Sequence, residues 1–187
     1  ALERLISDAA EADFCIVNMC LGVTKGEMCT RIPRAALEGI AATFSCDGFP
    51  VRRSGKPQCG VCTSCLLRRM ALEAAGLAGY DSSDGYGIDL TCDTSTPSEK
   101  QLNPLRAMEW QAELIRHAIG FRDPWTELSL IYPMLPVIAA ELSQGPNANQ
   151  TSIERDLVAL YTRHVAEWEG FSARGHLSDF RRHRLAA

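Results

Sequence analysis

Four closely spaced cysteines constrain the fold of this chain more than any other feature of its sequence. They are Cys46, Cys59, Cys62 and Cys65, and their spacing is C-x12-C-x2-C-x2-C. Two tight turns and one longer loop can bring four thiolates together into a tetrahedral shell that needs no other ligand. A closed shell of this kind is typical of structural zinc. The spacing therefore predicts one Zn²⁺ bound by these four side chains.

Two alternatives to zinc remain open from sequence alone. The cysteines could be reduced residues of a core, or they could hold an iron–sulfur centre, because sets of four sulfur ligands also select iron. Three cysteines at x2 spacing with a fourth nearby favour zinc. The chain has eight cysteines in all and opens with no secretory signal pattern. We therefore expect a reducing, cytoplasmic setting, in which clustered cysteines bind metal.

Composition narrows the classes of protein to consider. The 187 residues are 46% hydrophobic and 22% charged, as in an ordinary globular protein. The formal net charge of −4 argues against a protein whose main role is to coat nucleic acid. No stretch approaches the roughly 20 apolar residues that a membrane-spanning helix needs. We expect neither nucleic acid nor membrane as the main partner.

Apolar patterning and turn signals divide the chain into four parts. Residues 1–42 are predicted to be the end of an α/β nucleotide-binding-type domain, and residues 43–79 the four-cysteine zinc segment with its helix. Residues 80–97 are predicted to be a linker, and residues 98–187 a helical module. The predicted fold class is mostly α, with a small α/β remnant at the N-terminus. In this prediction the zinc segment is followed by the helical module.

Local signals place the elements of the N-terminal part. Apolar residues at helical spacing predict a helix over 1–12, and the β-forming run 14–17 predicts a buried strand. Thr24 and Glu27 have the spacing of a capping box, in which each side chain accepts a hydrogen bond from the other residue's backbone N–H. A short helix should follow this box, and another should occupy 34–42.

Other signals place the later helices. The pattern over 63–75 is helical and should end at Gly76 in a left-handed cap. Asn103-Pro104 predicts the start of a long helix, since proline is favoured at the first helical position. Thr151 and Glu154 have the spacing of a second capping box, which should open the last long helix.

Basic side chains gather around the predicted zinc site. Candidates for binding an anionic ligand or a partner are four residues in the cysteine loop and at a helix start: Arg52, Arg53, Lys56 and Lys25. Arg68 and Arg69 lie on the helix that leaves the site. We interpret these two as offsetting the net negative charge of a Zn²⁺ ion bound by four thiolates.

The flanks of the cysteines resemble a known family. The run Thr43-Phe44-Ser45-Cys46, the run Cys59-Gly60-x-Cys62-x-x-Cys65-Leu66-Leu67-Arg68-Arg69 and the run Glu73-Ala74-Ala75-Gly76 are similar to the C-terminal zinc segment of the 7-cyano-7-deazaguanine synthases. Thr24-Lys25-Gly26-Glu27-Met28 resembles the Thr-Lys-x-Glu stretch that precedes that segment. The resemblance covers roughly residues 20–80 and implies that the four cysteines ligate zinc.

The resemblance also implies an activity for the whole enzyme. These synthases are ATP pyrophosphatases of the queuosine pathway. They adenylate 7-carboxy-7-deazaguanine and convert it with ammonia, through an amide, to the nitrile. Their Ser-Gly-Gly-x-Asp-Ser loop for ATP and Mg²⁺ does not occur in this chain. We therefore expect that loop in a missing N-terminal part or in a partner subunit, and we expect this chain to be inactive alone.

The helical module suggests two further interpretations. A long helical extension resembles the divergent synthase-like proteins of bacterial anti-phage defence cassettes. The alternative to any ligase function is a non-enzymatic, zinc-stabilised helical protein that binds a protein or nucleic-acid partner.

Overall fold

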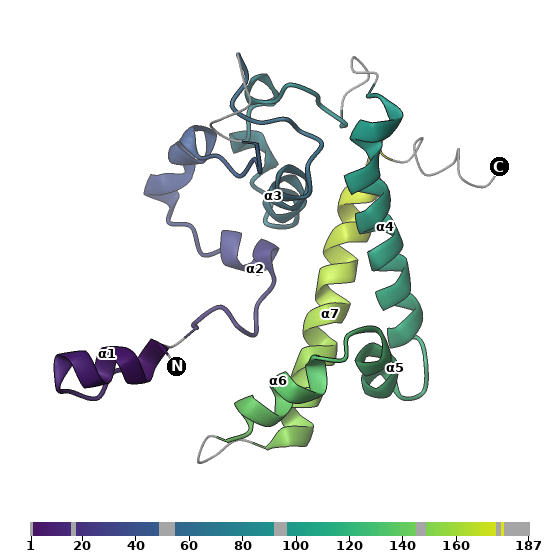
Figure 1. The fold of residues 1–187 in the computed structure, drawn as a ribbon. Helices are drawn as coiled ribbons and strands as arrows, with labels where there is room; N and C mark the ends of the chain where they lie inside the picture. Colours follow the sequence, from purple (N-terminus) through teal and green to yellow (C-terminus); the bar gives the residue numbers. More distant parts are fainter. Residues whose placement is uncertain are drawn as a thin grey trace.

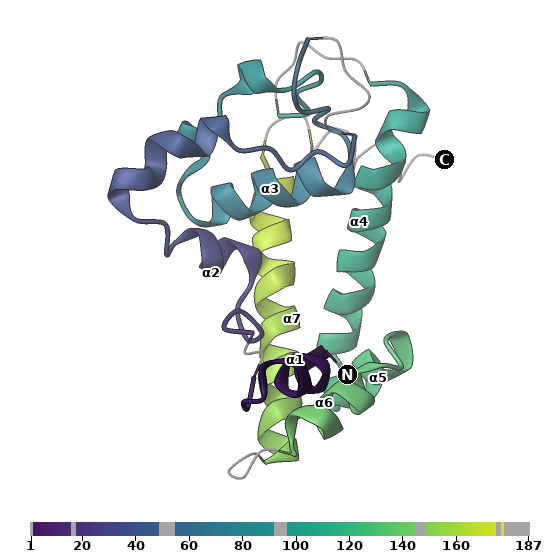
Figure 2. The same cartoon turned by 60° about the vertical axis from the view of Figure 1, so that its left-hand side comes forward.

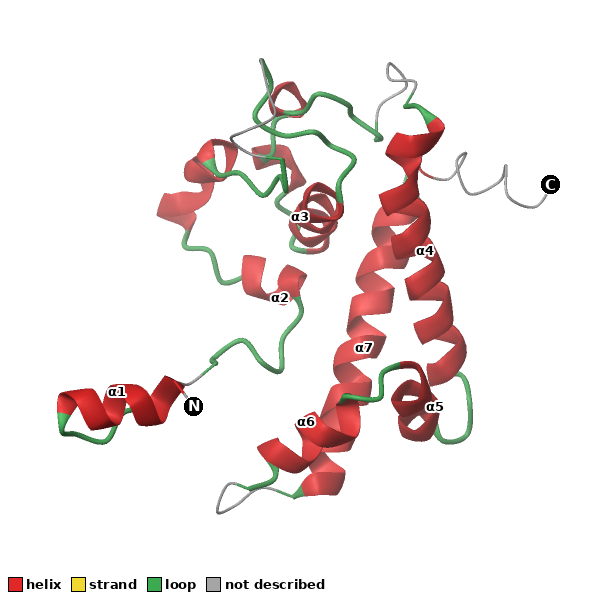
Figure 3. Ribbon diagram, viewed as in Figure 1, coloured by secondary structure: helices red, strands yellow, loops and turns green. Residues whose placement is uncertain are grey.

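The fold is a set of helices with a cysteine-rich, largely non-helical segment at one end. A computed structural model describes residues 2–15, 18–48, 55–91, 97–144, 149–174 and 177. The helical elements in these residues, three of them 3-10 helices marked η, are α1 (Leu2–Ala10), α2 (Lys25–Cys29), η1 (Arg34–Ala42), α3 (Thr63–Ala74), η2 (Ala78–Tyr80), η3 (Ser83–Gly85), α4 (Glu99–Ile119), α5 (Pro124–Ile131), α6 (Leu135–Leu142) and α7 (Gln150–Ser172). The described residues contain no strand (Figure 3), only an isolated bridge between Gln58 and Tyr86. The predicted mostly helical fold, with helices following the four cysteines, is confirmed.

Two long helices form the axis of the molecule. α4 and α7 lie side by side and run in opposite directions (Figure 1). α5 and α6 pack at one end of this pair, and α3 crosses it near the other end (Figure 2). In the part of the chain that the structure describes, no helix combines the length and the apolar character that crossing a bilayer requires.

The N-terminal residues differ from the predicted α/β remnant. α1 forms as expected but has no buried residue. Phe14 and Cys15 lie outside any strand, and Phe14 is 44% exposed, so the predicted buried strand is wrong for these two positions. Ile16 and Val17 lie outside the described residues. A strand needs a neighbouring strand to satisfy its backbone groups, and the described residues offer none here.

The predicted starts of two long helices are corrected. α4 begins at Glu99 behind a capping box of Ser98 and Gln101, and it contains Pro104 in its second turn. The reciprocal cap outweighs the single backbone hydrogen bond that this proline removes. α7 is capped by Asn149, whose side chain accepts from the backbone N–H of Ser152 at 3.1 Å. The cap predicted at Thr151 is therefore wrong, because a stronger cap residue precedes it.

Other local predictions are confirmed. Thr24 and Glu27 form the expected capping box at the start of α2. α3 ends before Gly76, which has φ of +70° and so supplies the left-handed conformation that ends the helix.

Buried apolar residues form two clusters at opposite ends of the α4–α7 pair. The first joins the cysteine segment to both long helices and consists of Cys46, Cys59, Val61, Cys65, Leu66, Met70, Tyr86, Leu90, Leu102, Leu105, Met108, Ala112, Trp168, Phe171 and Leu177. The second lies where α5 and α6 pack and consists of Ile115, Ala118, Leu128, Leu135 and Val165. The cysteine segment and the helical module therefore share one core.

Candidate metal centre

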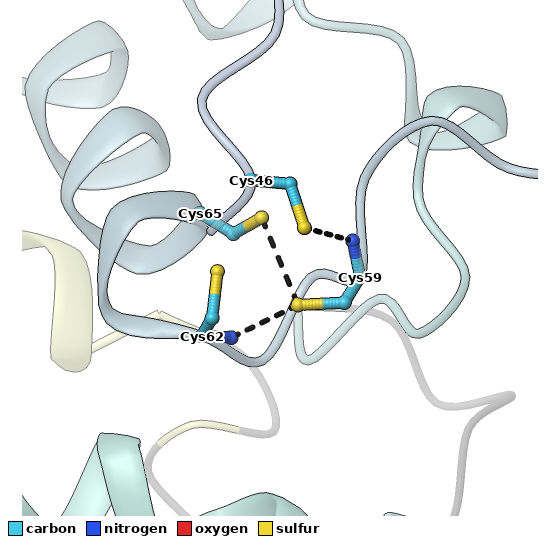
Figure 4. A group of neighbouring side chains, drawn as sticks. All are labelled: Cys46, Cys59, Cys62 and Cys65. Carbon is cyan, nitrogen blue, oxygen red and sulfur yellow. Dashed lines mark hydrogen bonds between the residues drawn. The ribbon is translucent and has the colours of Figure 1, made fainter. Parts of the chain in front are cut away.

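The four predicted ligands are brought together in the fold. The sulfur atoms of Cys46, Cys59, Cys62 and Cys65 all lie within 4.8 Å of one another, and their side chains converge on one point (Figure 4). The sulfurs of Cys59 and Cys65 are 3.9 Å apart. Zinc–sulfur bonds of about 2.3 Å in a tetrahedron put neighbouring sulfurs about 3.8 Å apart. The sulfur positions therefore fit a tetrahedral metal ion.

Different parts of the chain position the four sulfurs. Cys46 comes from the loop that follows η1, and Cys59 from the turn that precedes α3. Cys62 is the N-cap residue of α3, and Cys65 lies in its first turn. The positive end of the α3 dipole thus lies at the cluster, where it stabilises negative charge on the sulfurs.

Backbone amides turn toward the sulfurs. The N–H of Cys59 donates to Sγ of Cys46 at 3.4 Å, and the N–H of Cys62 donates to Sγ of Cys59 at 3.2 Å. Hydrogen bonds of this kind orient metal-binding thiolates and offset their charge. The x2 spacing produces the second of these bonds, whereas the first joins residues 13 apart across the longer loop.

Gly60 is required for the first of these turns. Its φ is +80°, which side chains rarely adopt. A Cβ atom built on it would lie 1.7 Å from the carbonyl oxygen of Ile88. The backbone of a second segment therefore approaches the cysteine turn at a distance that only glycine allows.

Burial and hydrogen bonds shift the pKa values of the cluster thiols in opposite directions. Burial raises the pKa of Cys46, but backbone N–H donors from Gly48 and Cys59 outweigh it and lower the pKa to about 7. Burial raises the pKa of Cys62 to about 11 and also raises the pKa of Cys65. Cys62 and Cys65 therefore remain protonated at neutral pH until a cation displaces their protons.

The segment that follows η2 closes over the cysteine turn. The N–H of Gly87 donates to the carbonyl of Gln58 at 2.8 Å, and the N–H of Ile88 donates to the carbonyl of Cys59 at 3.1 Å. The side chain of Gln58 in turn accepts from the N–H of Ser45 at 3.2 Å, beside the first cysteine. These bonds join the three pieces of chain that surround the cluster.

A buried ionic network lies beside the cluster. Nε of Arg68 donates to Asp81 at 3.1 Å, and the guanidinium of Arg69 bonds both carboxylate oxygens of Asp89. The guanidinium carbon of Arg69 also lies 4.1 Å from the centre of the Tyr86 ring. Both arginines are thus paired with carboxylates of the segment that follows η2, Asp81 and Asp89, so neither is free to bind an external anion.

Sequence reasoning missed the partners in this network. Asp81, Tyr86 and Asp89 lie in the polar stretch predicted to be a linker, whose described part packs on the cysteine segment. Tyr86, Ile88 and Leu90 alternate with other residues there, and this period-two pattern was the available signal of an extended, half-buried segment. Residues 92–96 lie outside the described residues, and the division into domains stays a prediction.

Of the four predicted anion-binding residues, the structure describes Lys56 and Lys25. Arg52 and Arg53 lie outside the described residues. The ammonium of Lys56 donates to the backbone carbonyl of Asp84. Lys25 is the exposed first residue of α2, and it has no ion-pair partner among the residues that the structure describes.

The cluster has the ligand number, spacing, burial and N–H donors of a metal site made of thiolates. Cys46, Cys59, Cys62 and Cys65 therefore form a group that can hold one metal ion. Comparison with protein-family models, with curated proteins and with solved structures finds no match for this chain.

Proposed function

We propose that the four cysteines bind one Zn²⁺ and that the role of this ion is structural. The observation that carries the proposal is the convergence of four sulfurs within 4.8 Å, inside the core cluster that joins the cysteine segment to α4 and α7. Four thiolates fill the tetrahedral shell and leave no position for water or substrate. A redox-inert ion in a closed shell holds the chain together and does no chemistry on a ligand.

The ion would join pieces of chain that have little regular structure. Cys46 follows η1, whereas Cys62 and Cys65 begin α3, and the metal would tie these together at the surface that packs on Trp168. The N–H donors and the α3 N-terminus would offset the net negative charge of the centre. The reduced thiols that such a site needs favour a cytoplasmic location.

Cobalt substitution tests the ligand assignment. Co²⁺ in a tetrahedral thiolate site absorbs in the visible range and shows sulfur-to-cobalt charge transfer in the near ultraviolet. We expect both features in the wild-type chain. Cys62→Ser should lose most of the charge-transfer intensity, whereas Cys29→Ser, which changes a cysteine outside the cluster, should keep it. Equal spectra for the two variants would contradict the assignment.

We further propose that this zinc segment belongs to a 7-cyano-7-deazaguanine-synthase-like, ATP-dependent ligase. The supporting observation is that α2, which carries the Thr-Lys-x-Glu stretch, packs against α3, which follows the cysteines. The two parts of the sequence on which the resemblance rests are therefore neighbours in space. ATP and Mg²⁺ would bind to a nucleotide-binding part outside this chain, supplied by the same protein or by a partner subunit.

A reconstituted assay tests the ligase proposal. The chain is combined with the nucleotide-binding part encoded with it, and AMP and pyrophosphate are measured with ATP, ammonia and 7-carboxy-7-deazaguanine. AMP formation that depends on the deazaguanine is the expected result. ATP turnover indifferent to the deazaguanine, or no turnover, would contradict the proposal.

The second candidate function is a non-enzymatic interaction protein. It is favoured by α1, whose apolar residues include Leu2 at 58% and Leu5 at 66% exposure and which has no buried residue. An amphipathic helix that leaves its apolar side chains exposed is typical of a segment that binds another protein. A mobility-shift assay at physiological salt separates nucleic-acid from protein partners, and the net charge predicts no shift.

A further inference from the structure

A cavity lies on the face of α3 that looks away from the long helices. It is enclosed by α2, η1 and α3, and its volume is about 360 Å³. Its walls are mainly apolar: Cys29 and Ile32 line one side, Ile40 another, and Leu72 the floor on α3. The volume falls within the range of small-molecule sites, which run from about 300 to 1,000 Å³.

The charge of the cavity has one sign. No carboxylate is among its described lining residues, which include the two cations Lys25 and Arg68. Arg68 is already neutralised by Asp81 at 3.1 Å. Lys25 has no ion-pair partner within the described ranges, so it gives the cavity an unmatched positive charge at the start of α2.

An apolar cavity with a single unmatched cation fits one class of ligand. The apolar walls would take up a hydrocarbon or aromatic body, because removing that surface from water is favourable. The ammonium would pair with one anionic group, and the absence of a lining carboxylate avoids repulsion. We propose that this cavity binds a small, largely apolar organic acid whose carboxylate pairs with Lys25. The proposal depends neither on zinc identity nor on ligase activity.

A matched pair of compounds tests the role of charge. The probes are 2-naphthoate and its uncharged analogue 2-naphthamide, which share one bicyclic body. Their dissociation constants are measured by ligand-observed NMR on the zinc-loaded chain. We expect 2-naphthoate to bind more tightly than 2-naphthamide by about fivefold, since a partly exposed ion pair is worth little more than that.

Two variants locate the binding. Gly39 lines the cavity, and a Cβ built on it meets nothing within 4 Å, so Gly39→Leu adds a bulky side chain at the cavity without a clash at Cβ. Gly79→Leu is its control, because Gly79 also lies in a 3-10 helix with open space around it but does not line the cavity. Lys25→Met removes the charge, and Lys100→Met removes one from an exposed position of α4.

The expected pattern is specific. Gly39→Leu should abolish binding of both compounds, and Lys25→Met should weaken 2-naphthoate about fivefold while leaving 2-naphthamide unchanged. Both control variants should bind as the wild type does. The proposal is overturned if the wild type binds neither compound at millimolar concentration, if it binds both equally, or if Gly39→Leu leaves binding intact.

Discussion

The two ends of the α4–α7 pair are stabilised in different ways. At the α5–α6 end, regular helices bury apolar side chains such as Leu128 and Leu135, and this packing is sufficient. At the cysteine end, the segments around Gln58 and Ile88 have hardly any regular structure, and their buried groups include thiols, guanidinium groups and carboxylates. Within a helix the backbone N–H and C=O groups hydrogen-bond to one another. Buried irregular segments lack those bonds and need other hydrogen bonds and ion partners for their polar groups.

This difference implies that the cysteine end depends on a metal ion for its stability and that the helical end does not. Isolated charges and polar groups are costly to bury, so the cysteine end holds together only when every one of them has a partner. The helical end has no such requirement. Removing an ion, a charge or a methylene group should therefore affect the two ends unequally.

Removal of the metal should have the largest effect. Binding of structural zinc is worth about 10 kcal/mol or more in small zinc domains, and that free energy is also folding free energy. With a strong chelator we expect the backbone amides of residues 58–62 and 85–90 to lose protection from hydrogen exchange. The backbone amides of α5, the helix that carries Leu128, should keep their protection. Equal loss at both ends would contradict the distinction between them.

Asp89→Asn should have the next largest effect, about 4 kcal/mol, because it removes the bidentate carboxylate partner of the buried Arg69 and leaves only Asp81 at 4.0 Å. Urea unfolding of the zinc-loaded protein measures the change. Asp84→Asn is the control, since it removes an exposed carboxylate from the same segment. A loss as small as that of the control would show that the ion pair does not stabilise this end.

The same variant has a predicted pH dependence. Burial raises the pKa of Asp89, but hydrogen bonds from Arg69 and Thr91 outweigh it and hold the pKa well below its ordinary value of 3.8. A depressed pKa contributes stability above the ordinary value and loses it as the pH falls. The wild-type advantage over Asp89→Asn should thus be full near pH 7 and shrink below about pH 4. Zinc content is measured in parallel, because loss of the metal would open residues 85–90 and by itself remove the wild-type advantage.

Leu128→Ala tests the helical end by itself. The side chain is fully buried, and its truncation should cost about 3 kcal/mol through lost burial and a residual cavity. Leu130→Ala, at an exposed position of the same helix, should cost much less. Zinc content should stay at the wild-type level in both variants. Loss of zinc from Leu128→Ala would mean that the two ends are not independent.

Leu5→Ser should have the smallest effect. Leu5 is exposed in α1, a helix that buries none of its residues, so unfolding free energy should change by no more than about 0.5 kcal/mol. Thermal unfolding checks this. A large destabilisation would show that α1 contributes to one of the two ends.

Sequence patterns predicted the features that depend on residues close together in the chain. The four ligands, the Thr24 capping box and the helix end at Gly76 follow from spacings of a few residues. The pairing of Arg69 with Asp89 could not be predicted, because it joins residues 20 apart across a segment without regular structure. The buried strand expected at Phe14 is wrong for a related reason, since β-propensity has no effect without a partner strand.

The metal content of the purified chain tests the central claim most directly. Elemental analysis of wild-type protein, prepared under reducing conditions without added metal, should find one zinc per chain. Substitution of Cys65, whose side chain is fully buried in the cluster, should abolish it. Iron in place of zinc would contradict the assignment of the ion, and a metal-free chain that keeps amide protection at residues 58–62 would contradict the structural role of the centre.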